Sequence, residues 1–172
     1  ILYYAKLARE TGVDLFCIGT EMQAFVQARP LYWNKLIDKV SDAFQGPLTY
    51  AANWDEVSEF PLWNRMDYIG VDGYFPLCEK DRPSMKELET GWSTHVDALA
   101  RLSAAEDRPV LFTEMGYCST ANCAAKPWSE DRDAVPDQQA EAQAWQAVFN
   151  VVANKPWYAG WFMWELFAYE KR

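Results

Sequence analysis

Five short apolar or β-branched runs recur along the chain and are separated by polar and helix-forming segments. None of them shows the clean alternation of apolar and polar positions that marks a strand with one solvated face. Runs of this kind are typical of strands buried on both faces, as in a parallel sheet covered by helices. The sequence therefore predicts five strands, at residues 13–20, 47–52, 67–72, 108–113 and 158–164.

Between these runs, apolar residues recur at the helical period. The predicted helical segments are residues 31–45, 84–105 and 138–152, and the first 12 residues are typical of the end of an amphipathic helix. Ser84 opens the sequence SMKE, a capping box for the second segment, and Pro136 and Asp137 introduce the third. Strands and helices alternate throughout, which predicts an α/β fold with right-handed crossovers.

Two α/β architectures fit this alternation. A doubly wound sheet that binds a nucleotide would need a glycine-rich phosphate loop after a strand, but IGTEMQA at residues 18–24 has one glycine followed by a carboxylate. A (β/α)8 barrel, or TIM barrel, needs eight strands and about 250 residues. Residues 1–172 are therefore interpreted as a single domain that forms the C-terminal portion of such a barrel.

Polar or aromatic residues follow every predicted strand. In a parallel barrel the carboxyl ends of the strands open on one face, which is where the active sites of such enzymes lie. Glu21 and Glu114 are the most specific of these residues because each directly follows an apolar strand. The other residues at the strand ends are Asn53, Trp54, Asp55, Asp72, Gly73, Tyr74, Tyr117, Trp164 and Glu165.

Two carboxylates that project over one barrel mouth can hydrolyse a glycosidic bond. The reaction retains the anomeric configuration when the carboxyl groups lie about 5–5.5 Å apart, whereas a separation of about 6.5–9.5 Å admits a water and gives inversion. The acid must hold a proton near neutral pH, which a neighbouring negative charge or partial burial would favour. A surface or loop-capping role is the alternative for Glu21 and Glu114.

The composition narrows the class of ligand. The chain has 25 acidic and 16 basic residues, a formal charge of −9, and no cluster of Lys and Arg. A nucleic acid or an anionic membrane is therefore disfavoured as a partner, and neutral or cationic ligands fit better. Aromatic residues make up 16% of the chain, including nine Trp. This supply suits stacking on sugar rings, although core packing explains most of them.

Other features of the sequence add little about location or cofactors. No run of about 18 apolar residues and no signal peptide is seen, but the chain starts inside a predicted helix, so a preceding segment is expected and secretion is only slightly favoured. Cys118 and Cys123 share one loop, where they could form a short-loop disulfide or remain ordinary thiols. The acidic loop at residues 129–137 lacks the spacing of a calcium loop, and no metal or cofactor is predicted.

Six motifs, in this order and spacing, carry a resemblance to a known family. They are CIGTEM, YAANWDE, MDYIGVDGYFPL, PVLFTEMGY, AAKPW and GWFMWELF. Together they resemble glycoside hydrolase family 113, which contains retaining β-mannanase-like enzymes on a (β/α)8 barrel whose two catalytic Glu follow strands four and seven. The resemblance spans nearly all of the chain and implies that the visible strands are strands four to eight.

The resemblance also implies roles for individual residues. Glu21 would be the acid/base, Glu114 the nucleophile, and Tyr74 would hydrogen-bond the nucleophile and orient it. Trp164 would form a stacking platform under the sugar next to the cleaved bond. The other residues assigned to substrate binding are Asn53, Trp54, Tyr117, Lys126 and Trp128.

Several of these residues have a plain structural alternative. Core packing is the alternative for Tyr74 and Trp164, because aromatic residues commonly fill the top layer of a barrel. Glu165 is as compatible with an ion pair as with ligand contact. His95 lies near the apolar stripe of its predicted helix and is assigned a structural or exposed position.

Two departures from the wider clan of the family bear on function. Thr20 stands where an Asn usually precedes the acid/base, and the first three strands of the barrel lie outside the chain. A barrel that cannot close leaves sheet edges exposed, and open edges pair with other chains. The stretch alone is therefore expected to be poorly soluble and to have little activity.

The sequence thus predicts a retaining endo-β-glycosidase that hydrolyses a β-linked polysaccharide, with β-1,4-mannan as the first choice and no cofactor. Xylan or another β-glycan is the alternative substrate, because part of the cleft comes from strands outside the chain. A noncatalytic carbohydrate-binding barrel is the alternative from a different class, and the paired Glu argue against it. The oligomeric state is not predicted.

Overall fold

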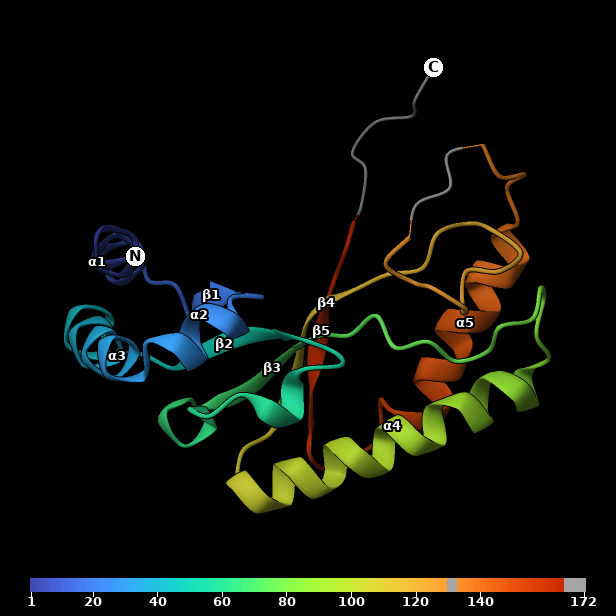
Figure 1. Cartoon of the computed structure of the whole chain (residues 1–172). Helices are drawn as coiled ribbons and strands as arrows, with labels where there is room; N and C mark the ends of the chain where they lie inside the picture. Colours follow the sequence, from blue (N-terminus) through green and yellow to red (C-terminus); the bar gives the residue numbers. More distant parts are fainter. Residues whose placement is uncertain (130–132, 166–172) are drawn as a thin grey trace.

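The structure, a computed structural model, describes residues 1–129 and 133–165. Its strands form one parallel sheet in which each strand pairs with the next along the chain (Figure 1). The predicted parallel α/β arrangement is confirmed. The strands are β1 (Phe16–Thr20), β2 (Leu48–Asn53), β3 (Tyr68–Asp72), β4 (Val110–Met115) and β5 (Tyr158–Met163).

The helices lie along the connections between these strands. Figure 1 shows α1 beside α3 at one end of the sheet and α4 beside α5 at the other, and both pairs are in contact. None of the helices in the described part of the chain is long and apolar enough to span a bilayer. The helices are α1 (Leu2–Glu10), α2 (Gln23–Ala28), α3 (Pro30–Phe44), α4 (Met85–Glu106) and α5 (Gln138–Val151), with short 3-10 helices η1 (Val57–Glu59) and η2 (Trp63–Arg65).

The structure confirms the predicted starts of two helices and shows the side chains that cap them. The Ser84 side chain accepts a hydrogen bond from the Glu87 backbone N–H, and the Glu87 carboxylate accepts one from the Ser84 N–H, which completes the capping box of α4. Asp137 caps α5 by accepting a hydrogen bond from the Ala140 N–H at 3.1 Å. These caps fix where the helices begin in the two longest connections, between β3 and β4 and between β4 and β5.

The two faces of the sheet carry different side chains. Large residues on one face pack against the helices: Tyr50 contacts Trp33 of α3 and Phe112 stacks on Trp92 of α4. The opposite face carries small or polar residues from neighbouring strands, which are Thr49, Ala51, Gly70, Asp72 and Thr113. Apolar residues also lie on this face, since Leu111 of β4 pairs with Gly70, and the runs therefore show no clean alternation of apolar and polar positions.

The register brings three polar residues into one row at the carboxyl edge of the sheet. Asn53 of β2 pairs with Asp72 of β3, and Asp72 pairs with Glu114 of β4. The pairing slips between Val71 and Asp72, so that Thr113 is an extra residue in β4 and forms a bulge. Because of this bulge Glu114 lies within β4, one residue before its end, rather than after the strand as predicted.

Candidate active site

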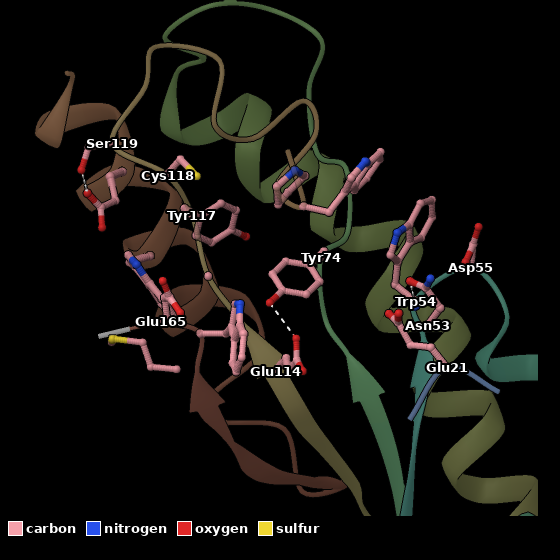
Figure 2. A pocket seen from close by; sticks show the side chains of 17 residues that line it. Glu21, Asn53, Trp54, Asp55, Tyr74, Glu114, Tyr117, Cys118, Ser119 and Glu165 are labelled. Carbon is pink, nitrogen blue, oxygen red and sulfur yellow. Dashed lines mark hydrogen bonds between the residues drawn. The ribbon is translucent and has the colours of Figure 1, made fainter. Parts of the chain in front are cut away.

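A pocket of about 880 Å³ lies at the carboxyl edge of the sheet, where the strand ends converge (Figure 2). Its walls come from the ends of all five strands and from the loop and helix that follow β4. Eight residues that the sequence assigns to the site line it: Glu21, Asn53, Trp54, Tyr74, Glu114, Tyr117, Trp128 and Trp164. The ninth, Lys126, is exposed and is not among the lining residues. Its assignment to substrate binding stays a prediction.

Glu114 is held by a neighbouring tyrosine. The Tyr74 hydroxyl donates a hydrogen bond to Glu114 Oε2 at 2.9 Å, drawn as a dashed line in Figure 2. Both side chains are half-buried. Burial and the contact with Glu114 raise the pKa of Tyr74, so the phenol stays protonated and remains a donor. The hydrogen bond fixes the direction of a carboxylate that the bulge of β4 already turns into the pocket.

Glu21 approaches the same pocket from the end of β1. Its backbone N–H donates to the Ala51 carbonyl at 2.9 Å, and the next N–H, that of Met22, donates to the Tyr50 hydroxyl. Glu21 itself adopts a left-handed backbone conformation with φ of 51°. Such a conformation is uncommon for a residue with a side chain and persists where surrounding contacts impose it. The neighbouring strand therefore fixes the position of Glu21.

The charges in the pocket act on Glu21. Partial burial raises the pKa of Glu21, and the negative charge of Glu114 raises it further, with smaller contributions from Glu56 and Asp55. Glu21 therefore has the electrostatic environment of a carboxyl group that holds its proton beside a second, hydrogen-bonded carboxylate. A difference of this kind between two carboxyl groups separates an acid from a nucleophile.

Aromatic side chains line the rim of the pocket. Trp54, after β2, stacks on Trp128, from the loop after β4, with ring centroids 5.7 Å apart and planes inclined by 19°. Trp164, after β5, is 55% exposed and therefore is not a core residue. Flat, partly exposed indoles of this kind present apolar faces to a ligand. Tyr117, in contrast, is 7% exposed and packs edge-on against Trp145 of α5.

The backbone of Trp164 is docked tightly against the end of β4. The Trp164 N–H donates to the Met115 carbonyl at 2.9 Å, and the peptide bond to Glu165 is cis. Gly116, the residue after β4, has no side chain at a point where a Cβ would lie 1.7 Å from the Trp164 carbonyl oxygen. Only glycine permits this approach, and Trp164 lines the same pocket as Glu114.

The structure adds pocket residues that the sequence did not single out. Glu141 and Trp145 belong to α5, which the sequence predicted as a helix without assigning it a role in the site, and Ser119 donates a hydrogen bond to Glu141. Glu165, for which the sequence left open an ion pair or a ligand contact, also lines the pocket. No sequence pattern marks Glu141 and Trp145 as pocket residues, because the start of a helix over a barrel mouth has the same pattern as the start of any other helix. The remaining lining residues are Asp55, Gly116, Cys118, Pro127 and Met163.

Other residues raised by the sequence lie in structural positions. The ring nitrogen Nε2 of His95 lies at hydrogen-bond distance, 3.0 Å, from the Pro76 carbonyl oxygen, and the ring packs on Phe75. Cys118 and Cys123 are thiols rather than a disulfide. In residues 1–129 and 133–165 no group of three or more His, Cys, Asp and Glu is arranged to hold a metal ion. Residues 130–132 of the acidic loop lie outside the described residues.

Comparison with known proteins places this geometry in a family. The model of Glycoside Hydrolase Family 113 matches residues 1–171. The β-mannanase of this family from Alicyclobacillus acidocaldarius, solved in complex with ManMIm, is 26% identical with a TM-score of 0.81. The alignment covers 95% of this chain and 48% of that one. The partial (β/α)8 barrel is thereby confirmed, since the chain spans about half the length of the solved relative.

Two further comparisons define the range of the likeness. A complex of a family 113 β-1,4-mannanase is 25% identical over 95% of this chain and 49% of that chain, with a TM-score of 0.81. A β-glucuronidase from Faecalibacterium prausnitzii is 16% identical over 95% and 28% of the two chains, with a TM-score of 0.64, and shows a shared fold alone. A search of curated proteins found no match to the chain.

Proposed function

Because the chain belongs to glycoside hydrolase family 113, we propose that it supplies both catalytic carboxyl groups of a retaining β-mannanase. The observation that carries the proposal is the pairing of two unlike carboxyl groups in one pocket. Glu114 accepts a hydrogen bond from Tyr74 at 2.9 Å, and Glu21 is made more basic by burial and by the charge of Glu114. The solved relatives are β-mannanases, which supports mannan as the substrate.

In the proposed mechanism each carboxyl group acts twice. Glu21 first protonates the glycosidic oxygen while Glu114 attacks the anomeric carbon, and the leaving sugar departs with the proton. This step leaves a covalent glycosyl ester on Glu114. Glu21, now ionised, removes a proton from a water molecule that attacks the same carbon, and Glu114 leaves as a carboxylate with overall retention.

The aromatic rim supports an extended substrate. Trp164 lines the same pocket as Glu114 and would stack on the sugar whose bond is cleaved, and Trp54 and Trp128, which also line the pocket, stack on each other. Platforms at separate points along one pocket suit a chain of several sugars better than a single sugar. We therefore propose endo action on a polysaccharide.

The charge of the pocket favours a neutral sugar. Within the described residues, its lining carries five carboxyl groups, Glu21, Asp55, Glu114, Glu141 and Glu165, and neither Lys nor Arg. A carboxylate on the sugar would be repelled from such a site. The likeness to the β-glucuronidase fold therefore gives no reason to propose a uronide, and an uncharged glycan such as mannan fits the pocket better.

The proposal is tested on the whole protein with a panel of β-1,4-mannan, xylan, β-glucan and an aryl β-glucuronide. We expect manno-oligosaccharides as products, the β-anomer first in NMR spectra, and no turnover of the glucuronide. Glu114→Gln, which keeps the size of the side chain, should lower kcat by about 1000-fold or more. Glu10→Gln, an exposed change at the end of α1, is the matched control. Mannan binding without hydrolysis by the unaltered protein would instead support a noncatalytic barrel.

A further inference from the structure

Asp72 is a carboxylic acid buried beneath the pocket, between the two proposed catalytic residues. It ends β3, and the register of the sheet places it beside Glu114 of β4 and Asn53 of β2. The residue is 0% exposed. It is not among the residues that line the pocket, so it would influence a reaction there only through its neighbours.

One of the two carboxyl oxygens of Asp72 lacks a hydrogen-bond partner. Oδ1 accepts a hydrogen bond from the Thr113 hydroxyl at 2.8 Å. Oδ2 is buried and has no such partner within residues 1–129 and 133–165. A buried, charged oxygen without a donor is costly, whereas a protonated oxygen carries no charge. The hydrogen bonding of this site therefore favours the neutral acid.

The charged groups that face Asp72 are acidic. Burial is the main cause that raises the pKa of Asp72 to about 7, and the charges of Glu114 on β4 and of Glu21 after β1 raise it further. The Thr113 hydrogen bond acts in the opposite direction. None of the described groups that act on Asp72 is cationic. The other titratable groups that interact with it are Cys17 on β1, Tyr50 on β2 and Tyr74 after β3.

We propose that Asp72 is a positioning residue of the proposed glycosidase, a third carboxyl group that helps Glu21 to keep its proton when Asp72 ionises. The inference rests on the proposed function of Glu21 as acid/base. The repulsion between two carboxylates is mutual. Because the charge of Glu21 makes Asp72 harder to ionise, the charge of an ionised Asp72 also makes Glu21 harder to ionise. Asp72 therefore extends the activity toward alkaline pH.

The test is the pH dependence of kcat/KM for the whole protein and for Asp72→Asn, which keeps an acceptor for the Thr113 hydroxyl but cannot ionise. We expect less than about a twofold change at pH 5 and a loss of about 3- to 10-fold at pH 8, as the alkaline limb moves down by about 0.5–1 pH unit. Asp97→Asn, an exposed change on α4, is the matched control. Superimposed profiles, or a uniform loss at every pH, would overturn the inference.

A second variant guards against misfolding of Asp72→Asn. Thr113→Val removes the hydrogen bond that favours the ionised form, so Asp72 should stay neutral to higher pH and the alkaline limb should shift in the same direction by a smaller amount. No shift, or a shift toward higher pH, counts against the proposal.

A spectroscopic readout separates this inference from the proposed function. Infrared difference spectra of the whole protein should show a protonated carboxyl band that disappears as the pH passes through about 7, and the band should be absent from Asp72→Asn. If the protein hydrolyses no glycan but shows the band, the proposed function fails and the neutral acid stands. If it hydrolyses mannan but the spectra of the two proteins agree, only the inference about Asp72 fails.

Discussion

At the residue scale, the side chains around Glu21 and Glu114 distinguish two groups of the same chemical type. Glu114 is held by a phenol that remains protonated, whereas Glu21 is strained in its backbone, partly buried and repelled by the charge of Glu114. Repulsion and burial favour the protonated form, and a donated hydrogen bond favours a fixed carboxylate. The environment of each Glu therefore supports the role that the sequence resemblance implied.

The hydrogen bond between Tyr74 and Glu114 should matter for turnover more than for folding. A hydrogen bond to a charged group contributes about 1.5–3 kcal/mol, so Tyr74→Phe should lower kcat by about 10- to 100-fold. The KM should change little, because the ring remains in place. Steady-state kinetics on manno-oligosaccharides measure the effect, with Tyr32→Phe, an exposed change on α3, as control. An unchanged kcat would show that Glu114 is oriented without Tyr74.

Asp72 should make the stability of the whole protein depend on pH. The pKa of Asp72 is about 7 in the folded chain, whereas the ordinary value of 3.8 applies to the unfolded chain. Between these two pH values the folded state holds a proton that the unfolded state releases. The free energy of unfolding therefore falls as the pH rises from about 4 to about 7, by a few kcal/mol for this group. In urea denaturation, the free energy of unfolding of Asp72→Asn should rise relative to that of the unaltered protein as the pH rises through this range. A constant difference at every pH would contradict this.

At the element scale, the junction between the ends of β4 and β5 brings the Trp164 backbone against Gly116. Gly116→Ala should displace the Trp164 backbone, because the new Cβ would lie 1.7 Å from its carbonyl oxygen. Misplacement by about 1 Å can cost about 100-fold in rate, so we expect kcat/KM to fall by about 10- to 100-fold, with altered tryptophan fluorescence. Activity within twofold of the unaltered protein would mean that Trp164 does not need this approach.

Gly12→Ala is the matched control for this variant. Gly12 has φ of +70°, but an added Cβ there meets nothing within 4 Å. The change should therefore cost stability through backbone strain, which thermal denaturation measures, while turnover stays the same. Comparison of the two variants separates crowding at the pocket from the general effect of adding a side chain to a glycine.

The elements differ in how well the sequence predicts them. The strands and long helices follow from hydrophobic runs and caps, although β1 begins at Phe16 rather than at residue 13 and β4 extends to Met115 rather than to residue 113. The helix α2 was not predicted, because six residues are too few for a visible period. The bulge at Thr113, which turns Glu114 into the pocket, is a matter of strand pairing and leaves no signal in one sequence.

The candidate site was predictable where a residue ends a strand and unpredictable where packing decides. Glu21, Tyr74 and Glu114 are found from their positions after apolar runs. Asp72 is also at a strand end, but its importance arises from complete burial and an unpaired oxygen, which no local pattern records. Lys126 was included because its motif matches the family, and it is exposed and not among the residues that line the pocket.

At the scale of the whole molecule, the sheet has two open ends. β1 and β5 each pair with one neighbour within the described residues, and Phe162 and Met163 at the β5 end are exposed. Open parallel edges with apolar side chains favour association with other chains. The expectation that the stretch alone is poorly soluble and weakly active therefore stays a prediction, and functional measurements belong on the whole protein.

We propose that Glu114 acts as the nucleophile and Glu21 as the acid/base, and azide rescue distinguishes these two roles. The whole protein with Glu114→Ala or Glu21→Ala is given an aryl β-mannoside, whose leaving group needs no protonation, together with azide. We predict an α-linked mannosyl azide from Glu114→Ala, because azide replaces the nucleophile, and a β-linked one from Glu21→Ala, because azide attacks the covalent intermediate. No rescue of either variant, or the opposite pair of products, would contradict the assignment.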